Sequence, residues 1–400
     1  MLQQKIKKLA QNYWQEIIDI RRHIHTYPEL SFQEYQTAEF IVSVLDKLGV
    51  ERYANVADTG TIAYIKGKNP DKKTIVLRAD IDALPITEEN NVSYKSKNQG
   101  VMHACGHDVH TASLLGVIKI LQDCKDDFEG TVKCIFQPGE ETAPGGATLM
   151  IKEGVLEAQH QTQKPKSIIG QHVMPYLPIG TIGFRSGVYM ASADELYVKV
   201  IGKGGHGATP ENCIDPVLIA SHIIIALQQI ISRIGSPKIP SVLSFGKVIA
   251  NGATNIIPNE VYLEGTFRTY NEEWRENAHQ KMKKMAEGIA EAMGGKCEFT
   301  IVRGYPFLKN EENLTKRLKN FAIEYMGEEN VKDLDLWLAA EDFAYYTQII
   351  DGCFYRLGTR NEEKNIISGV HTPTFDIDEK ALEIGAGLMA WLAVKELSME

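Results

Sequence analysis

The fold is decided by the stretch Thr74-Ile75-Val76-Leu77-Arg78-Ala79-Asp80-Ile81-Asp82. It begins with a continuous apolar run, which is typical of a strand buried on both faces of a parallel sheet. It ends with two aspartates, which therefore lie at the carboxyl end of that strand. Open α/β sheets place their functional sites at this edge. The stretch predicts both the kind of sheet and the edge at which the chemistry takes place.

Strand and helix patterns alternate on both sides of this stretch. The expected elements are strands at 61–66, 74–79 and 131–136 and helices at 4–26, 35–48 and 108–122. Such alternation indicates an α/β fold with a mainly parallel sheet that helices cover on both faces.

The pattern changes near residue 188. The elements expected there are a strand at 195–201, a helix at 216–234, two strands on either side of 255–258, a helix at 272–293 and a strand at 297–302. This order is that of a small ferredoxin-like α+β domain. After residue 302 the first pattern returns. We therefore expect a catalytic domain made from residues 1–187 and 303–400, with a second domain inserted at 188–302.

The composition excludes several classes of protein. The 400 residues are enough for two domains with sizeable cores, and 44% hydrophobic and 24% charged residues are typical of a soluble globular chain. A net charge of -9 with no basic tract argues against a nucleic-acid partner. The longest apolar run, near Ile223 to Ala226, is too short to predict a membrane span, and residues 1–20 lack the core of a secretory signal. Six irregularly spaced cysteines suggest free thiols in a reducing compartment, so we expect a cytoplasmic protein.

A candidate metal site lies in the sequence His103-Ala104-Cys105-Gly106-His107-Asp108-Val109-His110. A thiolate and an imidazole two residues apart can reach the same metal, and zinc-like metals accept both. The alternatives are a buried cysteine beside a core histidine, or a nucleophilic Cys105 with His107 as its base. The second alternative leaves the other acidic and histidine residues described below unexplained.

The adjacent carboxylates Glu140 and Glu141 follow the strand expected at 131–136. Neighbouring side chains on a strand or tight turn point in different directions, so one can bind metal while the other faces a water molecule. That division suits metal-assisted hydrolysis, in which a free carboxylate removes a proton and later returns it. The alternative is a solvated acidic turn.

Three more residues extend this set. Asp82 can orient a metal-binding side chain from behind, or it can cap a helix or turn. His172 and His371 are isolated in the sequence, and either one alone would be read as a structural histidine. Together with Cys105, His107 and one of the two glutamates, these two histidines complete a set of five ligands for two metal ions.

The inserted domain contributes His206, Asn255 and Arg268. Polarising an amide carbonyl needs a donor aimed at the developing oxyanion, and a histidine in a glycine-rich turn can supply it. An arginine binds a carboxylate through two hydrogen bonds. For Arg268 the alternative is a surface salt bridge.

With these residues in place, the chain resembles the M20 metallopeptidase family, in its amidohydrolase branch. That branch includes N-acyl-L-amino-acid amidohydrolases, hippurate hydrolases and plant auxin-conjugate hydrolases. The resemblance covers nearly the whole chain. Its most specific motifs are Leu77 to Pro85, the cysteine–histidine sequence, Gly202 to Gly207, Asn255 to Pro258, and Glu341-Asp342-Phe343-Ala344. One variation is Gly139, where many relatives have alanine, and we expect no mechanistic consequence from it.

The resemblance implies a role for each candidate residue. Cys105 would bridge two divalent ions, with His107, Glu141, His172 and His371 as the other ligands. The general base would be Glu140, and Asp82 would lie behind the ligands. His206 would reach in from a partner subunit to stabilise the oxyanion, and Asn255 and Arg268 would hold the substrate carboxylate and its surroundings. The inserted domain would act as a lid and as the interface of a homodimer.

The predicted function is therefore hydrolysis of N-acyl amino acids, such as N-acetyl or N-benzoyl derivatives. A dipeptidase or carboxypeptidase on the same scaffold is the alternative, because a peptide bond is also an amide. A metal-dependent binding protein without turnover is a third hypothesis, and the intact Glu140 argues against it. The thiolate favours zinc, while manganese, cobalt or nickel also support activity in relatives.

Overall fold

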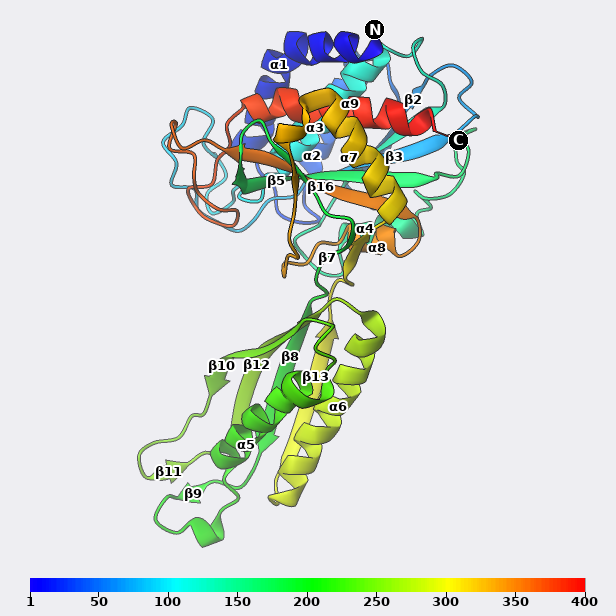
Figure 1. The fold of residues 1–400 in the computed structure, drawn as a ribbon. Coiled ribbons are helices and arrows are strands. Elements are labelled where there is room, and N and C mark those ends of the chain that lie inside the picture. Colours follow the sequence, from blue (N-terminus) through cyan, green and yellow to red (C-terminus); the bar gives the residue numbers. More distant parts are fainter. Residues whose placement is uncertain (400) are drawn as a thin grey trace. The chain divides into compact units, whose positions relative to one another are not determined.

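The chain forms two compact units in a computed structural model that describes residues 1–399 (Figure 1). The first unit contains Met1–Gly187, Lys309–Asp335 and the chain from Asp342 onward. The second contains Val188–Leu308 and the short segment Leu336–Glu341. Its start coincides with the start expected for the inserted domain, but it extends to Leu308 rather than residue 302.

The segment Leu336–Glu341 was not expected to join the second unit. It does so through backbone hydrogen bonds that a sequence pattern does not reveal. The amide of Trp337 donates to the carbonyl of Tyr189 at 2.9 Å, and the amide of Ala191 donates to the carbonyl of Trp337 at 3.1 Å. The chain therefore crosses between the two units four times instead of twice.

In the described part of the chain, the first unit is built on an eight-stranded sheet with the order β1-β2-β4-β3-β5-β16-β6-β15. Its strands are β1 Glu51–Val56, β2 Gly60–Lys66, β3 Thr74–Asp80, β4 Thr131–Gln137, β5 Ser167–Pro178, β6 Ile182–Phe184, β15 Val331–Asp333 and β16 Asp351–Arg360. The four central strands β4, β3, β5 and β16 are parallel, whereas β1, β2 and β6 pair with antiparallel neighbours. All residues of β3 and β4 are buried, as the apolar run at Thr74 predicted.

Helices cover both faces of this sheet (Figure 1). They are α1 Leu2–Thr26, α2 Tyr35–Lys47, α3 His107–Gln122, α4 Gly146–Lys152, α7 Glu312–Met326, α8 Ala344–Thr347 and α9 Lys380–Leu397, with a 3-10 turn at Glu328–Asn330. The helices α1, α3 and α9 pack against one another over one face, and α4 and α8 lie against the other. Helix α3 is buried along almost its whole length, so the residues at its start are held rigidly.

The second unit is a four-stranded antiparallel sheet with the order β10-β12-β8-β13 among the described residues. Its elements are β8 Asp194–Ile201, β9 Gly205–His206, a 3-10 turn at Pro210–Asn212, α5 Pro216–Gln229, a π-helical turn at Ile230–Ile234, β10 Ser241–Ile249, β11 Ile256–Ile257, β12 Glu260–Thr269, α6 Glu272–Ala292 and β13 Lys296–Arg303. The chain crosses between the units in β7 Gly187–Met190 and β14 Leu308–Asn310. The main elements follow one another as strand, helix, two strands, helix, strand. The predicted fold class, α/β with a ferredoxin-like insertion, is confirmed.

Helix α5 is more apolar than its longest uninterrupted run suggested. By length and composition, the 19 residues Pro216–Ile234 are sufficient to cross a membrane, with a mean hydropathy of 1.7. One side of the helix packs into the core of the second unit through Ile219, Ile223 and Leu227. Only 28% of the stretch is buried, so an apolar face of the helix remains exposed. Packing of α5 against the sheet of the second unit explains why its buried side is apolar. It does not explain why its exposed side is apolar as well.

Candidate metal centre

Loops of the first unit meet at the carboxyl edge of its parallel strands. They bring together the predicted site residues Asp82, Cys105, His107, Glu140, Glu141, His172 and His371. The turn before α3 depends on Gly106, which has a φ of 85° and whose Cβ, if present, would lie 2.5 Å from Val173. The amide of His371 donates to the carbonyl of Ala104 at 2.7 Å. A loop far along the chain is thereby fixed beside Cys105.

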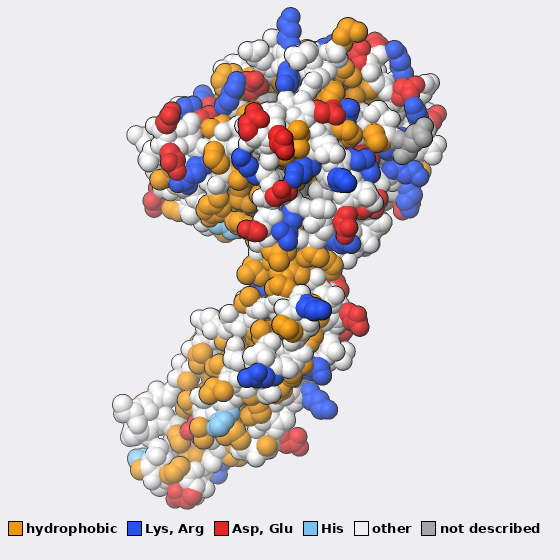
Figure 2. Space-filling view, viewed as in Figure 1, with side chains coloured by type: hydrophobic (Ala, Val, Ile, Leu, Met, Phe, Trp, Pro, Cys, Tyr) orange, Lys and Arg blue, Asp and Glu red, His pale blue; other side chains and the backbone are white. Residues whose placement is uncertain are grey.

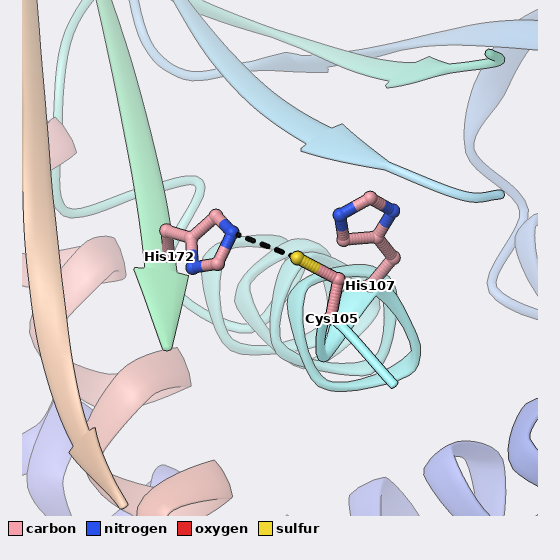
Figure 3. A group of neighbouring side chains, drawn as sticks. All are labelled: Cys105, His107 and His172. Carbon is pink, nitrogen blue, oxygen red and sulfur yellow. Dashed lines mark hydrogen bonds between the residues drawn. The ribbon is translucent and has the colours of Figure 1, made fainter. Parts of the chain in front are cut away.

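Cys105 lies at the centre of this group. Its Sγ is 3.5 Å from Nε2 of His172 and 3.3 Å from Nε2 of His371. Figure 3 shows the ring of His172 directed from β5 at the sulfur, with His107 beside it at the start of α3. Cys105, His107 and His172 form one set of converging ligand atoms, and Cys105, Glu141 and His371 form another. Cys105 belongs to both sets.

The two buried imidazoles direct Nε2 at the site. His172 donates from Nδ1 to the carbonyl of Val173 at 2.8 Å, and His107 donates from Nδ1 to the carbonyl of Asp82 at 2.9 Å. A backbone carbonyl can only accept, so in each neutral ring the lone pair is on Nε2. This is the tautomer that binds metal, held by a hydrogen bond to the other ring nitrogen.

Two buried atoms in the site lack a hydrogen-bond partner among residues 1–399. They are Nε2 of His107 and Oε1 of Glu141, which lie 3.8 Å apart, and Oε1 of Glu141 is also 3.3 Å from Nε2 of His371 without a hydrogen bond between them. Burying a polar atom without a partner is costly, so such atoms call for an explanation. A divalent cation would satisfy both, and thiolate, imidazole and carboxylate are the donors that zinc-like ions accept. The residues present therefore fit a metal centre.

The electrostatics of the site favour a positive charge. Burial lowers the pKa of His107, but the carboxylates of Asp80, Asp82 and Glu141 outweigh it and raise this pKa to about 10. Burial together with Glu141, Glu140 and Asp80 raises the pKa of the Cys105 thiol well above its usual value. A nucleophilic cysteine needs a lowered pKa, so the alternative of Cys105 as a nucleophile is disfavoured. Coordination to a metal ion would deprotonate the thiol.

Asp82 lies beside the candidate ligands His107 and Glu141. Its Oδ1 is 3.1 Å from Nδ1 of His107, and its Oδ2 accepts from the amide of Glu141 at 2.9 Å and from Oγ of Ser31 at 2.7 Å. Burial raises the pKa of Asp82, but these hydrogen bonds and His107 bring it below the usual value. One carboxylate therefore orients two ligands that are far apart in the sequence.

Sequence reasoning missed a second layer of buried polar residues around the site. Asp80 receives a hydrogen bond from Nδ1 of His110 at 2.6 Å, and Nε2 of His110 accepts from the amide of Val173 at 2.9 Å. Oε1 of the buried Glu34 accepts from the amide of Gly139 at 2.8 Å. Glu34 is isolated in the sequence, so no motif pointed to it. His110 does carry a signal, because it belongs to the cysteine–histidine sequence and lies about one helical turn after His107.

Gly139 has a structural role that was not expected. Its φ is 57°, and a Cβ at this position would lie 2.4 Å from the ring of Phe32. An alanine here would need Phe32 to move and the backbone to take a strained conformation. In this chain, Gly139 and Phe32 are therefore matched, and together with Glu34 they fix the turn that precedes Glu140.

The three candidates in the second unit fall into two groups. His206 and Asn255 lie together, because β9 pairs with β11 so that His206 faces Ile256, and the amide of Gly207 donates to the carbonyl of Asn255 at 2.9 Å. Arg268 lies near the end of β12 and donates to the carbonyl of Leu338 at 3.1 Å. It has no carboxylate partner within ion-pair distance among residues 1–399, so the alternative of a salt bridge is not supported. Burial lowers the pKa of Arg268.

These features define a class of protein: a two-unit protein with an α/β fold and a candidate metal centre at the carboxyl edge of its parallel strands. The chain matches the family model for peptidase family M20/M25/M40 over residues 76–395. The protein belongs to this family and is a hydrolase.

Relatives that are described as amidohydrolases, deacetylases and carboxypeptidases are similar to this chain over most of its length. The putative amidohydrolase YhaA of Bacillus subtilis is 42% identical, covering 98% of each chain. An N-acetyl-L-cysteine deacetylase of Bacillus subtilis is 39% identical, covering 96% of this chain and 88% of its own. Thermostable carboxypeptidase 1 of Saccharolobus solfataricus is 38% identical, covering 98% of each chain.

One solved structure bears directly on the metal centre. The Bacillus subtilis YxeP protein, described as a dinuclear metal-binding peptidase of the M20 family, superposes with a TM-score of 0.82. It is 36% identical and covers 98% of this chain and 100% of its own.

Proposed function

We propose that the protein hydrolyses the amide bond of N-acyl amino acids and releases a carboxylic acid and a free amino acid. The observation that carries this proposal is the convergence of Glu140 with the ligand set. Glu140 is buried, and its carboxylate lies in one group of converging atoms with the carboxylate of Glu141 and the imidazole of His107. A carboxylate held at a metal centre has the chemistry of an amidase, and the similarity to an N-acetyl-L-cysteine deacetylase supports the substrate class.

The residues would hold two divalent ions. Because Cys105 belongs to both ligand sets, we propose that it would help to hold both ions, together with His107 and His172 from one set and Glu141 and His371 from the other. Zinc suits this donor set, and manganese, cobalt or nickel are the other candidates. When bound, the ions would acidify a water molecule and polarise the scissile carbonyl.

The side chains of this chain supply the remaining chemistry. Glu140 takes a proton from the attacking water and returns it to the leaving amine, which is the role of a general base that becomes a general acid. Asp82 holds His107 and the amide of Glu141 in place throughout. The side chain of His371 is about half exposed, at 52%, which leaves one side of the site open to substrate.

Arg268 and the pair His206 and Asn255 cannot serve the same substrate within one chain. β9 and β11 lie beyond Glu260, the first residue of β12, whereas Arg268 is eight residues further along this strand. Eight residues of extended strand span roughly 25 Å, more than an N-acyl amino acid can bridge. We propose that Arg268 binds the substrate carboxylate at its own site, while His206 and Asn255 complete the site of a partner subunit.

A homodimer formed through the second unit would also explain its exposed apolar face. Val217, Leu218 and Ile225 on α5 are 40%, 51% and 72% exposed. Figure 2 shows hydrophobic side chains on the visible face of this unit. Strand β10 lies at an edge of the sheet and carries Val248, which is 56% exposed. An unpaired strand edge beside an apolar helix face suits pairing with a second copy about a two-fold axis.

The alternative function is a dipeptidase or carboxypeptidase on the same scaffold. The similarity to thermostable carboxypeptidase 1 favours it. Both reactions use Glu140 and the same metal centre, so the geometry of the first unit does not separate them. The two substrate classes differ on the acyl side of the scissile amide, so the choice between them depends on the residues that bind the acyl group.

Release of free amine from a panel of substrates tests the proposal. The panel holds N-acetyl and N-benzoyl amino acids, dipeptides and longer peptides, and each assay is repeated with the Glu140→Gln variant. Faster hydrolysis of N-acyl amino acids than of peptides, abolished in the variant, is the expected result. Preference for peptides would replace the proposal with the alternative, and no hydrolysis by metal-loaded protein would reject both.

We propose a cytoplasmic location for the protein. The six cysteines are unbridged in the structure, and four of them besides Cys105 are buried. Free, mostly buried thiols are typical of proteins in a reducing compartment.

A further inference from the structure

The motif Glu341-Asp342-Phe343-Ala344 is not among the predicted ligands or the base, yet carboxylate oxygens of Asp342 and Glu140 lie within 4.8 Å of each other. Asp342 is the first residue of the chain's last return to the first unit, and its side chain is fully buried. A carboxylate is rarely buried unless it is paired, so its partners indicate what it does.

The carboxylate of Asp342 ties three elements together. Its Oδ1 accepts from Nη2 of Arg78 on β3 at 2.7 Å, and its Oδ2 accepts from Nε2 of Gln137 on β4 at 2.8 Å. Oδ2 also accepts from the amide of Ala147 on α4 at 2.9 Å. Gln137 and Ala147 lie on either side of the turn that carries Glu140. The carboxylate therefore clamps this turn at both of its ends.

The backbone of Asp342 reaches the base itself. Its amide donates to Oε1 of Glu140 at 3.4 Å. A bond of this length is weak, so its main effect is to direct the carboxylate rather than to stabilise the fold. The same residue thus fixes the turn through its side chain and directs Glu140 through its backbone.

A second route leads from Asp342 towards the metal ligands. Arg78 also pairs with Asp80 through Nη1, and Oδ2 of Asp80 lies 3.7 Å from Nε2 of His107. A substitution at Asp342 could therefore act through Glu140 or through the ligand set, and an informative experiment has to distinguish the two routes.

We propose that Asp342 is a positioning residue for Glu140. Building on the proposed function, it keeps the base in one orientation while a proton moves between water and leaving amine. A misplaced base reduces turnover far more than substrate binding, because its contribution is made in the transition state. Residues that orient a catalytic group from behind typically contribute about 10- to 100-fold.

The experiment is a double-mutant cycle with Asp342→Asn and Glu140→Gln in the metal-loaded protein. Asp342→Asn alone should lower kcat about 10- to 100-fold with KM within about threefold of wild type and with the metal content unchanged. In the Glu140→Gln background the same substitution should lower kcat by less than about threefold, because residues that act through one another are not additive.

Three outcomes would overturn the proposal. They are a kcat for Asp342→Asn close to wild type, an equal loss in both backgrounds, and a loss of metal, which would indicate the route through Arg78 and Asp80. The matched control is Glu396→Gln, which removes another buried carboxylate, paired with Lys73 and Arg317, away from the site. It should lower the melting temperature and leave kcat within about twofold of wild type.

A second variant covers the case in which Asp342→Asn does not fold. Gln137→Met leaves the contact of Nη2 of Arg78 with Asp342 and removes the amide between Asp342 and the turn, together with the oxygen that accepts from Nε of Arg78 and from the hydroxyl of Tyr346. It should show the same loss of kcat and the same lack of additivity, and additive behaviour would overturn the proposal. The cycle is measured on whichever amide the wild type hydrolyses. If the proposed substrate class is wrong, the assay uses another amide, and the test of Asp342 still gives a result.

Discussion

At the scale of single residues, two neighbours with the same chemistry have different surroundings. The amide of Glu141 is held by Asp82, and its Oε1 faces His107 and His371. Glu140 points towards Asp342 instead. A difference of one position along the chain therefore separates the proposed ligand from the proposed base, because consecutive side chains leave a tight turn in different directions.

This difference predicts opposite effects of two equivalent substitutions. Glu140→Gln should keep the metal and the fold but lower kcat by about 10²–10⁴-fold, the usual contribution of a general base. Glu141→Gln should weaken metal binding first, so that its activity recovers with excess metal. Metal analysis after dialysis and turnover at a series of metal concentrations check both. If the two variants behave alike, the division of roles is wrong.

At the scale of elements, the turn before Glu140 is fixed by steric contact as well as by hydrogen bonds. Gly139→Ala should lower the free energy of unfolding by about 2–3 kcal/mol, because it combines a left-handed conformation with a contact of 2.4 Å to Phe32. Gly100→Ala is the matched control, since Gly100 has a φ of 78° and nothing within 4 Å of its Cβ position.

Urea unfolding measures both variants. The control isolates the backbone strain, which should amount to about 1–2 kcal/mol. The excess in Gly139→Ala then reports the contact with Phe32, and equal losses would show that this contact is relieved without cost.

Strand β4 carries a buried lysine whose charge makes stability depend on pH. Lys133 donates to the carbonyl of Val155 at 2.6 Å and to Oε1 of Gln159 at 3.1 Å. Burial lowers its pKa from 10.5 to about 8. Below pH 8 the lysine is protonated in both states, so the cost of burying its charge is fully present. Between pH 8 and 10.5 only the unfolded state keeps the proton, and stability therefore rises with pH in this window.

The variant Lys133→Met has no titrating group at this position, so it lacks this pH-dependent part of the stability. The free energy of unfolding of the wild type, minus that of the variant, should increase by on the order of 3 kcal/mol between pH 7.5 and 10.5. Urea titrations of both proteins across this range provide the measurement, and other titrating groups cancel in the difference. A difference that stays constant with pH would mean that Lys133 has an ordinary pKa.

The sequence pointed to the candidate ligands but not to the residues that hold them in place. Cys105, His107, Glu141, His172 and His371 were named from motifs, and the structure brings their ligand atoms together. Glu34 and the clamp formed by Asp342 were not found, because each acts through partners that only the folded chain brings near. Sequence motifs reveal functional residues that lie near one another along the chain. Residues that meet only in the folded chain form no motif.

At the scale of the whole molecule, the same contrast applies to the domains. The period of the hydrophobic pattern predicted the ferredoxin-like insertion and its start, because strands and helices of this kind are decided locally. The segment Leu336–Glu341 joins the second unit through backbone hydrogen bonds with Tyr189 and Ala191, which any sequence could make. The hydrophobic pattern of the sequence therefore does not show that this segment belongs to the second unit.

Mixing two inactive variants tests whether a homodimer shares its active sites between subunits. If His206 completes the site of a partner, chains with His206→Ala and chains with Glu140→Gln are each inactive alone but complement each other when mixed. A mixed dimer then has one site with both defects and one with neither. Random pairing at equal amounts makes half of the dimers mixed, so activity should return to about a quarter of wild type per chain. Confirmed subunit exchange without any return of activity would show that His206 acts within its own chain or not at all.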